Sequence, residues 1–424
     1  MPIIPRGRTI SMSGPPQQPQ QQSQPSSQPQ TRQGAAVDFD AVVDRRHTGS
    51  AKYDSAVRRG YPEDVLPLWV ADMDFPAAPP ILEALRARLD HGVFGYVEPW
   101  EEYYQSIIGW WQAHHGYLVQ KEWILESPSV VFSLNTAIRA FTRPGDGVII
   151  QTPVYGPFFS SVRLNGRKLI TNPLLYSTKE YAINFEDFQQ KIEEEKVKLF
   201  ILCSPHNPTG RVWTSMELQR LGNICRKNGV VVVSDEIHCD ITAPGFTHRV
   251  FAGLSPELEQ IAVTLTSPSK TFNLSGLQIS HVFIANEELR QAWINEKNAS
   301  GYDEPNAMGL TACQAAYEKG RPWLDQLLKY IDENEAYVKD FLKQYIRGVY
   351  PVQRQGTYLL WLDCWACGFS SKEFNQRLIE KGKLWIYDGG AFGEDGEGFQ
   401  RINLACPRET LSDALMRMSA LFTH

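Results

Sequence analysis

The lysine at position 270 is the residue of this chain with the clearest potential for covalent chemistry. It ends the segment IAVTLTSPSK, whose apolar run predicts a buried strand just before it. Lysine is strongly hydrated and seldom buried without purpose, and an amine with a lowered pKa can form a Schiff base with an aldehyde. Ser267 and Ser269 beside it carry hydroxyls that could hold a phosphate. Taken alone, a lysine on a turn is more often simply solvated.

Asp235 is a second candidate, in the segment VVVVSDEIHCDI. It ends a run of four valines, so we expect its carboxylate at the end of a buried strand, next to any cleft there. A carboxylate in that position can pair with a protonated pyridine nitrogen and keep the ring cationic, which makes the ring an electron sink. The alternative is a structural role, as a helix cap or a hydrogen-bond acceptor.

Asn207 is the third candidate, in CSPHNPTGRVW. It lies between two bonds that precede proline, in a tight turn that Gly210 closes, and either bond could be cis. The amide of Asn207 could donate a hydrogen bond to a phenolate oxygen of a bound ring. By itself this segment would be only a turn.

Apolar runs without alternation indicate strands buried on both faces, and therefore a parallel sheet covered by helices. Four such runs span residues 147–153, 198–205, 229–236 and 261–270. Helical patterns at 81–91, 133–141 and 215–229, the last with Gly229 as a C-cap, complete an alternating α/β pattern. Ligands bind beyond the carboxyl ends of parallel strands, and the polar residues at those ends predict a single site. These residues are Tyr155, Asn207, Asp235, Ser267 and Lys270.

The sequence predicts a three-layer α-β-α large domain at 81–312 and a smaller α+β domain made of 37–80 and 313–424. In the smaller domain we expect helices at about 323–345 and 372–381, with strand-like segments between and after them. Residues 1–36 are rich in Gln, Pro and Ser, have little to bury, and are predicted to be a disordered tail.

Composition narrows the class of function. The net charge of −6 and the absence of a dense basic cluster argue against a nucleic-acid partner and favour a small-molecule substrate. No apolar run reaches the roughly 20 residues that a membrane helix needs. Seven scattered cysteines indicate a reducing compartment, and we expect the cytoplasm. The C-x-x-C at Cys364 and Cys367 has no second pair and no histidine nearby, which favours ordinary buried thiols over a metal site.

The segments around Lys270, Asp235 and Asn207, in this order and spacing, resemble the fold type I pyridoxal-phosphate (PLP) enzymes of the class I/II aminotransferase superfamily. The resemblance extends from about Val37 to the C-terminus. It implies PLP as cofactor, with Lys270 as the Schiff-base lysine and the base at the substrate Cα. Asp235 is similar to the partner of the pyridine nitrogen, and Asn207 to the donor to the ring oxygen.

The same resemblance assigns the remaining contacts. Tyr155, in TPVYGPF, is similar to the aromatic residue that stacks on the ring. Ser267 and the backbone amides of Val130 and Val131 would bind the phosphate, since a helix N-terminus favours an anion. Arg401, in RINLAC, resembles the arginine that binds the substrate carboxylate.

Two residues depart from typical aminotransferases. His238 stands where many relatives have a tyrosine beside the ring oxygen, and Gln278 stands where many have a phosphate-binding arginine, which puts phosphate neutralisation in doubt. With VADMDFP (70–76) and HGVFGY (91–96), these departures resemble the cystathionine β-lyase-like branch of C–S lyases (MalY/PatB type). In that branch a tyrosine resembling Tyr96 reaches the phosphate of the neighbouring subunit, which implies a homodimer with shared active sites.

The branch resemblance implies β-elimination of a cysteine S-conjugate, such as cystathionine, to a thiol, pyruvate and ammonia. Transamination of an amino acid shares the first half of that chemistry and is the alternative. A relative without catalytic activity, acting as a binding protein, is a third reading. The presence of Lys270, Asp235, Asn207 and Arg401 together argues against it, because a binding module needs no such set.

Overall fold

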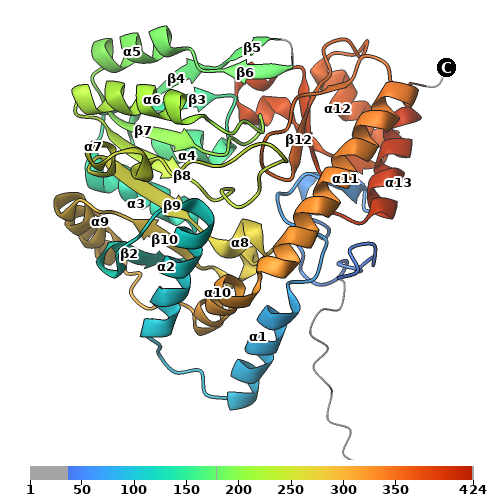
Figure 1. The fold of residues 1–424 in the computed structure, drawn as a ribbon. Coiled ribbons are helices and arrows are strands. Elements are labelled where there is room, and N and C mark those ends of the chain that lie inside the picture. Colours follow the sequence, from blue (N-terminus) through green and yellow to red (C-terminus); the bar gives the residue numbers. More distant parts are fainter. Residues whose placement is uncertain (1–36, 178, 423–424) are drawn as a thin grey trace, which may run out of the picture. The chain divides into compact units, whose positions relative to one another are not determined.

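The computed structural model describes residues 37–177 and 179–422. The predicted tail at 1–36 lies outside them. The large sheet has seven strands in the order β2-β10-β9-β8-β7-β3-β4 (Figure 1). The five strands from β9 to β4 run parallel, and β10 is antiparallel to both β9 and β2. Their bounds are β2 Ile124–Ser127, β3 Gly147–Thr152, β4 Lys168–Pro173, β7 Val197–Cys203, β8 Val231–Asp235, β9 Ala262–Thr266 and β10 Ser280–Phe283.

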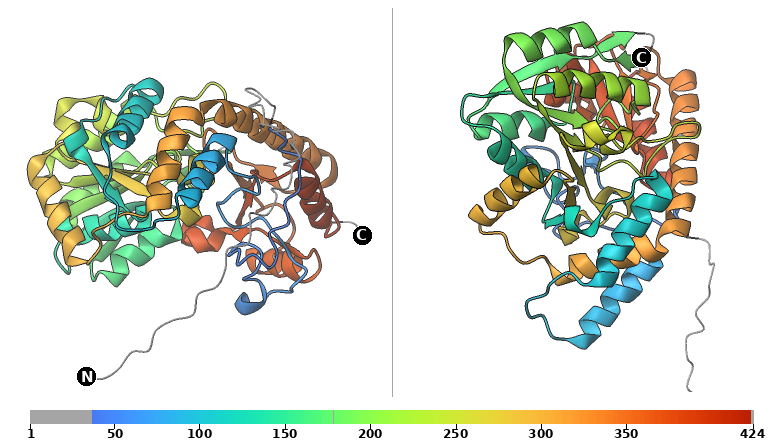
Figure 2. Two further views of the ribbon diagram at one scale, coloured as in Figure 1. Left: turned by 90° about the horizontal axis from the view of Figure 1, so that it is seen from below. Right: turned by 60° about the vertical axis from the view of Figure 1, so that its left-hand side comes forward.

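Helices cover both faces of this sheet, which confirms the predicted three-layer α/β fold (Figures 1 and 2). The helix α3 (Val130–Phe141) packs on β8 and β9 and contacts α4 (Gly156–Leu164) and α9 (Glu287–Ala299). On the strands β4, β7 and β8 lie α5 (Phe185–Glu194) and α6 (Ser215–Lys227). The four strands read from the apolar runs are all present.

The ends of the helices follow local sequence signals. At the start of α6, Thr214 accepts a hydrogen bond from the backbone of Glu217, whose side chain in turn accepts one from the backbone of Thr214. The residue that caps the other end is Asn228, and Gly229 follows with φ of 64°. The predicted cap at Gly229 was therefore one residue late. Helix α3 begins at Val130, three residues before the predicted start.

A second, antiparallel sheet of four strands is formed near the C-terminus, in the order β11-β12-β15-β14. Its strands are β11 Tyr350–Pro351, β12 Leu359–Asp363, β14 Tyr387–Asp388 and β15 Phe399–Asn403, and its helices are α11 Arg321–Tyr345, α12 Ser371–Glu380 and α13 Arg408–Ser419. The short strand β1 (Leu66–Pro67) pairs in parallel with β13 (Leu384–Trp385), which ties residues before 80 to this region. The pairing supports the predicted grouping of 37–80 with 313–424, and those boundaries stay a prediction.

Five further α-helices belong to the described chain: α1 Pro79–His91, α2 Glu101–His115, α7 Pro256–Glu259, α8 Pro268–Thr271 and α10 Ala307–Lys319. The strands β5 Leu175–Ser177 and β6 Glu180–Ala182 form a separate two-stranded sheet. Helix α10 packs against both α1 and α2. The one-turn helix α7 (Pro256–Glu259) packs on α6. Among the described residues, no helix combines the length and apolar character that a membrane crossing requires.

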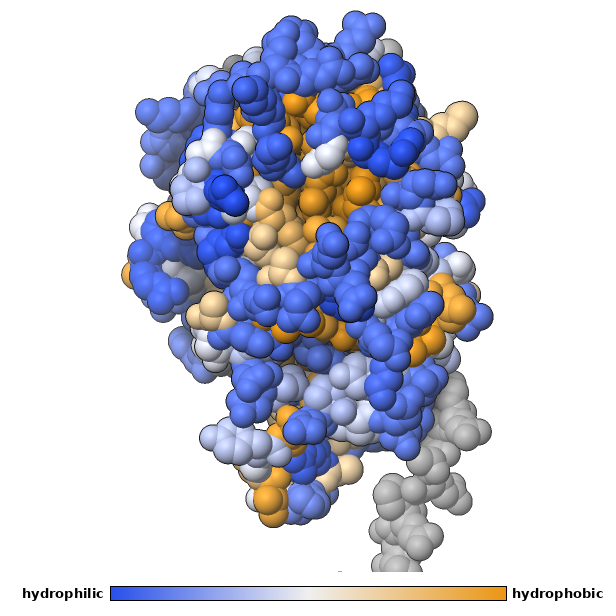
Figure 3. All heavy atoms as spheres, turned by 90° about the vertical axis from the view of Figure 1, so that its left-hand side faces the viewer, coloured by the Kyte–Doolittle hydropathy of each residue, from blue (hydrophilic) through white to orange (hydrophobic). Residues whose placement is uncertain are grey.

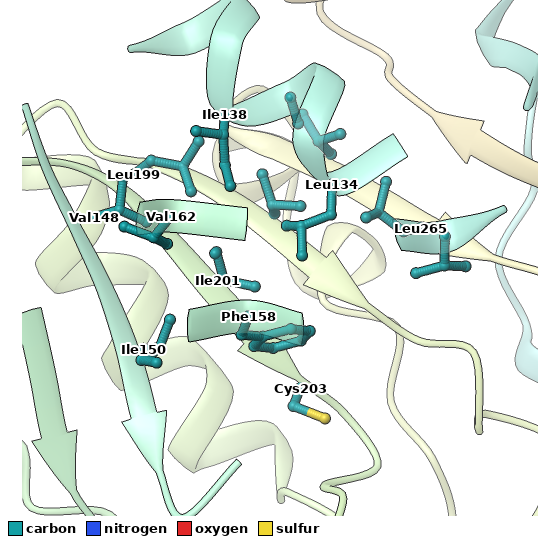
Figure 4. Packing of buried hydrophobic residues seen from close by; sticks show 14 of the residues in the cluster. Leu134, Ile138, Val148, Ile150, Phe158, Val162, Leu199, Ile201, Cys203 and Leu265 are labelled. Carbon is teal, nitrogen blue, oxygen red and sulfur yellow. The ribbon is translucent and has the colours of Figure 1, made fainter. Parts of the chain in front are cut away.

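The main core fills the space between α3, α4 and the sheet (Figure 4). Leu134 and Ile138 of α3 face Leu199 and Ile201 of β7, and all four are fully or almost fully buried. Because this core lies directly beneath the strand ends, its packing fixes where those ends and the first turn of α3 lie.

We expect Leu134→Ala to lower the free energy of unfolding by about 2–5 kcal/mol, because it leaves a cavity in a close-packed core. Leu134 is 1% exposed. The matched control is Leu164→Ala at the end of α4, where the side chain is 85% exposed and the change should stay within about 0.5 kcal/mol. Urea unfolding of both variants gives the comparison. Equal midpoints would contradict the assigned core.

Candidate active site

A cavity opens at the carboxyl ends of β3, β7, β8 and β9, where the sequence predicted a single site. Ten of the residues that the sequence analysis singled out line it. They are Val130, Val131, Tyr155, Asn207, Asp235, His238, Ser267, Ser269, Lys270 and Gln278. The structure also adds lining residues that the sequence analysis did not select, among them Ala71, Ser129 and Ser275.

Lys270 is held at this cavity by a short turn. Strand β9 ends at Thr266, and the Ser267 side chain accepts a hydrogen bond from the backbone of Ser269 to start the one-turn helix α8. The Nζ atom of Lys270 donates to the carbonyl oxygen of Ala71 at 2.7 Å. Burial lowers the pKa of this amine from 10.5 to about 8, partly opposed by the carboxylates of Asp72 and Asp235. The amine is thus much closer to its neutral, nucleophilic form than an exposed lysine.

Asp235 ends β8 on the same cavity. Its Oδ1 accepts a hydrogen bond from the backbone of Ile237 at 3.2 Å. Burial raises the pKa of this carboxyl from 3.8 to about 7, and the Ile237 amide and the charge of Lys270 offset only part of the effect. A buried carboxyl with so high a pKa lacks a close cationic partner. A protonated pyridine nitrogen would supply that partner, so the site fits the ring of PLP.

His238 is buried beside Lys270, and its imidazole ring is not fully hydrogen-bonded. Its Nδ1 atom is buried with no hydrogen-bond partner, and its ring meets the ring of Tyr358 edge-on at 5.9 Å. Burial, followed by the charges of Lys270 and Arg401, lowers the pKa of the imidazole to about 3. A neutral imidazole therefore stands at the position where many aminotransferases carry a tyrosine.

Arg401 reaches the site from the smaller sheet. On β15 it is 2% exposed, and its guanidinium donates to Asn207 Oδ1 at 2.8 Å and to the carbonyl oxygen of Trp69 at 2.7 Å. Its Nε atom is buried without a partner. Arg401 does not itself line the cavity, but it is one hydrogen bond from Asn207, which does. Since the oxygen of Asn207 is occupied by Arg401, the amide nitrogen of Asn207 remains free to donate to a ligand.

The end of the cavity suited to an anion is formed by the first turn of α3. Ser129 caps this helix, its hydroxyl accepting from the backbone of Phe132, and the amides of Val130 and Val131 have no acceptor within the helix. Ser267 also lines this cavity, but its hydroxyl donates to the carbonyl oxygen of Ile279 at 2.6 Å. Its hydrogen is therefore already engaged, and Ser267 would contact a phosphate only after giving up that bond.

Gln278 adopts a left-handed backbone with φ of 50° and lines the cavity together with Ser275. Among the described residues that line the cavity, Lys270 is the only lysine or arginine. Within this chain, the end of the cavity suited to an anion is lined by polar side chains and helix amides and by no arginine among the described residues. Ser275 was missed because a serine in a turn carries no distinctive signal.

The segment 70–76 forms a strap beside Lys270 that the sequence analysis had used only as a family mark. Asn273, with φ of 58°, accepts from the backbone of Met73 at 3.0 Å and donates to the carbonyl oxygens of Met73 and Phe75. Tyr358 donates to the same Ala71 carbonyl as Lys270, at 2.8 Å. Nothing in the local pattern predicted these contacts, because they join residues between 198 and 287 positions apart.

Tyr96 lies apart from the cavity of its own chain. It is 92% exposed on the connection between α1 and α2, which forms the lower end of the ribbon in Figure 1. Four neighbouring apolar side chains are exposed as well, namely Leu89, Val93, Phe94 and Trp100. Within one chain, then, the structure does not bring Tyr96 to the other site residues.

The lysine and the aspartate at the carboxyl edge of a mainly parallel sheet, beside a helix N-terminus, fit the fold type I class of PLP-dependent enzymes. Over residues 63–418 the sequence matches the family described as aminotransferase class I and II. The chain belongs to this family.

Comparison with known proteins places the chain among particular members. It is 44% identical over 384 residues to cystathionine beta-lyase PatB of Bacillus subtilis, covering 91% of this chain and 99% of that protein. It is 35% identical to protein MalY of Escherichia coli, covering 88% and 96%. The crystal structure of cystalysin from Treponema denticola, which contains a pyridoxal 5'-phosphate cofactor, matches with a TM-score of 0.89 and 36% identity, covering 92% of this chain and 99% of that chain.

The lowered pKa of Lys270 predicts how the cofactor-free protein captures PLP. Only the neutral amine attacks an aldehyde, so the rate of capture should rise with pH and level off above about 8, rather than continue toward 10.5 as for an ordinary lysine. Stopped-flow recording of the visible absorption band against pH measures this. A rate still rising steeply above pH 9 would show that burial does not depress this pKa.

Proposed function

We propose that this protein is a PLP-dependent C–S β-lyase that cleaves a cysteine S-conjugate of the cystathionine type to a thiol, pyruvate and ammonia. The observation that carries the proposal is the cavity lined by both the partly buried amine of Lys270, whose pKa is lowered to about 8, and the buried carboxyl of Asp235. The similarity to cystathionine beta-lyase PatB over 99% of that protein supports the choice of reaction. In the balanced reaction, R–S–CH₂–CH(NH₃⁺)–COO⁻ and water give RSH, pyruvate and ammonium.

When bound, PLP supplies an electron sink for the charge that develops at the substrate Cα. Lys270 would hold the cofactor and then, as the free amine, take the proton from Cα. Asp235 would keep the ring nitrogen protonated, and Asn207 would donate to the ring oxygen. Tyr155, half-buried on the cavity wall, would stack on the ring, and His238 would lie beside the ring oxygen.

The helix amides of Val130 and Val131, with Ser267, would hold the phosphate. Arg401 would bind the substrate carboxylate. Its partnerless, buried Nε atom supports that assignment, because a carboxylate would satisfy it without breaking the bond to Asn207. These contacts fix both ends of the substrate-cofactor pair on rigid strands and helices, while Lys270 stands between them on α8.

The decisive experiment is incubation of the PLP-loaded protein with cystathionine in the absence of any keto acid. Release of pyruvate and free thiol in equal amounts is the expected result. Strict dependence on an added keto acid would instead identify an aminotransferase. No reaction under either condition, together with no visible absorption band after addition of PLP, would favour a non-catalytic binding protein.

We expect Lys270→Ala to abolish the visible absorption band and to lower the rate of thiol release by at least about 10³-fold, because both the covalent attachment and the base at Cα are lost. Lys297→Ala, on the outer helix α9, is the matched control and should leave both readouts unchanged. If Lys270→Ala retained the visible absorption band, another amine would have to hold the cofactor.

We further propose a homodimer in which Tyr96 enters the site of the neighbouring subunit. The apolar side chains exposed around Tyr96 support this, because a monomer gains nothing from exposing them together. The face in Figure 3 also shows hydrophobic residues gathered in a recess among hydrophilic ones.

All seven cysteines are buried free thiols, which supports a cytoplasmic location.

Shared sites predict complementation between two weakened variants. Lys270→Ala and Tyr96→Phe should each have little activity alone, whereas dissociating, mixing and reassociating them should restore about a quarter of the wild-type rate, since half the dimers then hold one intact site. Mass measurement by light scattering checks that the variants dissociate to monomers before mixing and return to dimers afterwards. If Tyr96 served its own chain, no mixture would recover activity.

A further inference from the structure

The carboxylate of Asp240 is a buried junction behind the candidate site. It accepts hydrogen bonds from three side chains, namely Trp110 Nε1 at 3.0 Å, His115 Nε2 at 2.8 Å and Thr271 Oγ1 at 2.7 Å. Trp110 and His115 belong to α2, Thr271 to α8, and Asp240 itself to the turn that follows β8. One side chain thus joins the helix that carries Lys270 to the turn that carries Asp235 and His238.

Asp240 is ionised in this environment. Burial acts to raise the pKa of this carboxyl, but the hydrogen bonds from His115, Thr271 and Trp110 outweigh burial and leave the pKa lowered. Hydrogen bonds to an ionised acceptor are shorter and stronger than those between neutral groups. The junction is therefore stiffer than three ordinary side-chain bonds would be.

His115, Cys239 and Asp240 could also be regarded as a metal site, because their ligand atoms lie within 4.8 Å of one another. Two observations argue for a hydrogen-bonded junction instead. Both oxygens of Asp240 already accept well-formed bonds. Burial also raises the pKa of the Cys239 thiol well above its usual range, whereas a metal binds the thiolate.

The turn is anchored at its other end in the same way. Glu236 lies within 2.7 Å of His248 Nε2, and its second oxygen accepts from Ser234 Oγ at 2.8 Å and from the backbone of Phe251 at 3.0 Å. Asp235 and His238 line the cavity, whereas Glu236 and Asp240 do not. The two buried carboxylates of Glu236 and Asp240 thus anchor the turn through bonds outside the cavity lining.

We propose that Asp240 is a positioning residue that, through Thr271, holds the amine of Lys270 in register with the carboxyl of Asp235. Thr271 is fully buried and directly follows Lys270, and its hydroxyl links α8 to a buried carboxylate outside the cavity lining. The assignment rests on the proposed function, because alignment of these two groups matters only if Lys270 holds the cofactor whose ring nitrogen Asp235 pairs with.

The test compares Thr271→Val, which keeps the shape and removes the hydroxyl, with Thr271→Ser, which keeps the hydroxyl. Thr271→Val should lower kcat roughly ten- to a hundredfold with KM little changed, because Arg401 is untouched and only the alignment is loosened. Thr271→Ser should recover most of the rate. Asp240→Asn, which removes the charge, should lower kcat at least as much as Thr271→Val.

A second readout does not depend on lyase activity. In the cofactor-free protein, Thr271→Val should shift the pH midpoint for capture of PLP upward, because a looser Lys270 is better solvated and its pKa returns toward that of an ordinary lysine. The charged groups that act on this amine, Asp72, Asp235 and Arg401, stay in place. Thr271→Ser should keep the wild-type midpoint.

Two results would overturn the proposal. One is a Thr271→Val protein with unchanged kcat and an unchanged capture midpoint. The other is a loss of kcat that Thr271→Ser fails to recover although it folds with the thermal stability of the wild type. A wild-type protein without lyase activity would contradict the proposed reaction instead. The pH midpoint for capture of PLP would still test the role of Asp240.

Discussion

The site depends on the exclusion of water from two ionisable groups. Lys270 is partly buried and Asp235 is buried at the ends of adjacent strands, and desolvation pushes their pKa values toward one another, to about 8 and about 7. Desolvation disfavours the charged form of each group, and a ligand that carries an aldehyde and a basic ring nitrogen would satisfy both. The rest of the fold can be understood as a scaffold that excludes water from these two groups and holds them near one another without a direct ion pair.

That scaffold is built from both sheets. Strands β8 and β9 of the large sheet deliver Asp235 and Lys270, while β15 of the smaller sheet delivers Arg401 to the oxygen of Asn207. The carbonyl oxygens that hold Lys270 and Arg401 both come from the chain before α1, at Ala71 and Trp69. Three separate stretches of sequence therefore have to fold correctly before the cavity has its full set of polar groups.

Sequence reasoning reached the part of this site that rests on regular elements. A run of valines followed by Asp235 predicts a buried strand with a carboxylate at its end, and the same logic places Asn207 and Lys270, so these residues could be brought together without a structure. Ala71, Asn273 and Ser275 could not, because their contributions come from backbone carbonyls, a left-handed turn and tertiary proximity. Arg401 could be assigned only by resemblance, since nothing in its local sequence says which sheet edge it will face.

The turn after β8 sorts its polar residues onto two faces, with Asp235 and His238 toward the cavity and Glu236 and Asp240 toward buried anchors. Residues that line the cavity and residues that anchor the turn are thereby interleaved in one short segment. A substitution at position 238 changes the cavity lining but removes none of the hydrogen bonds of Glu236 and Asp240, whereas one at position 240 removes bonds to α2 and α8 without changing the lining. For protein engineering, the lining of the cavity and the anchoring of the turn can therefore be varied at separate positions.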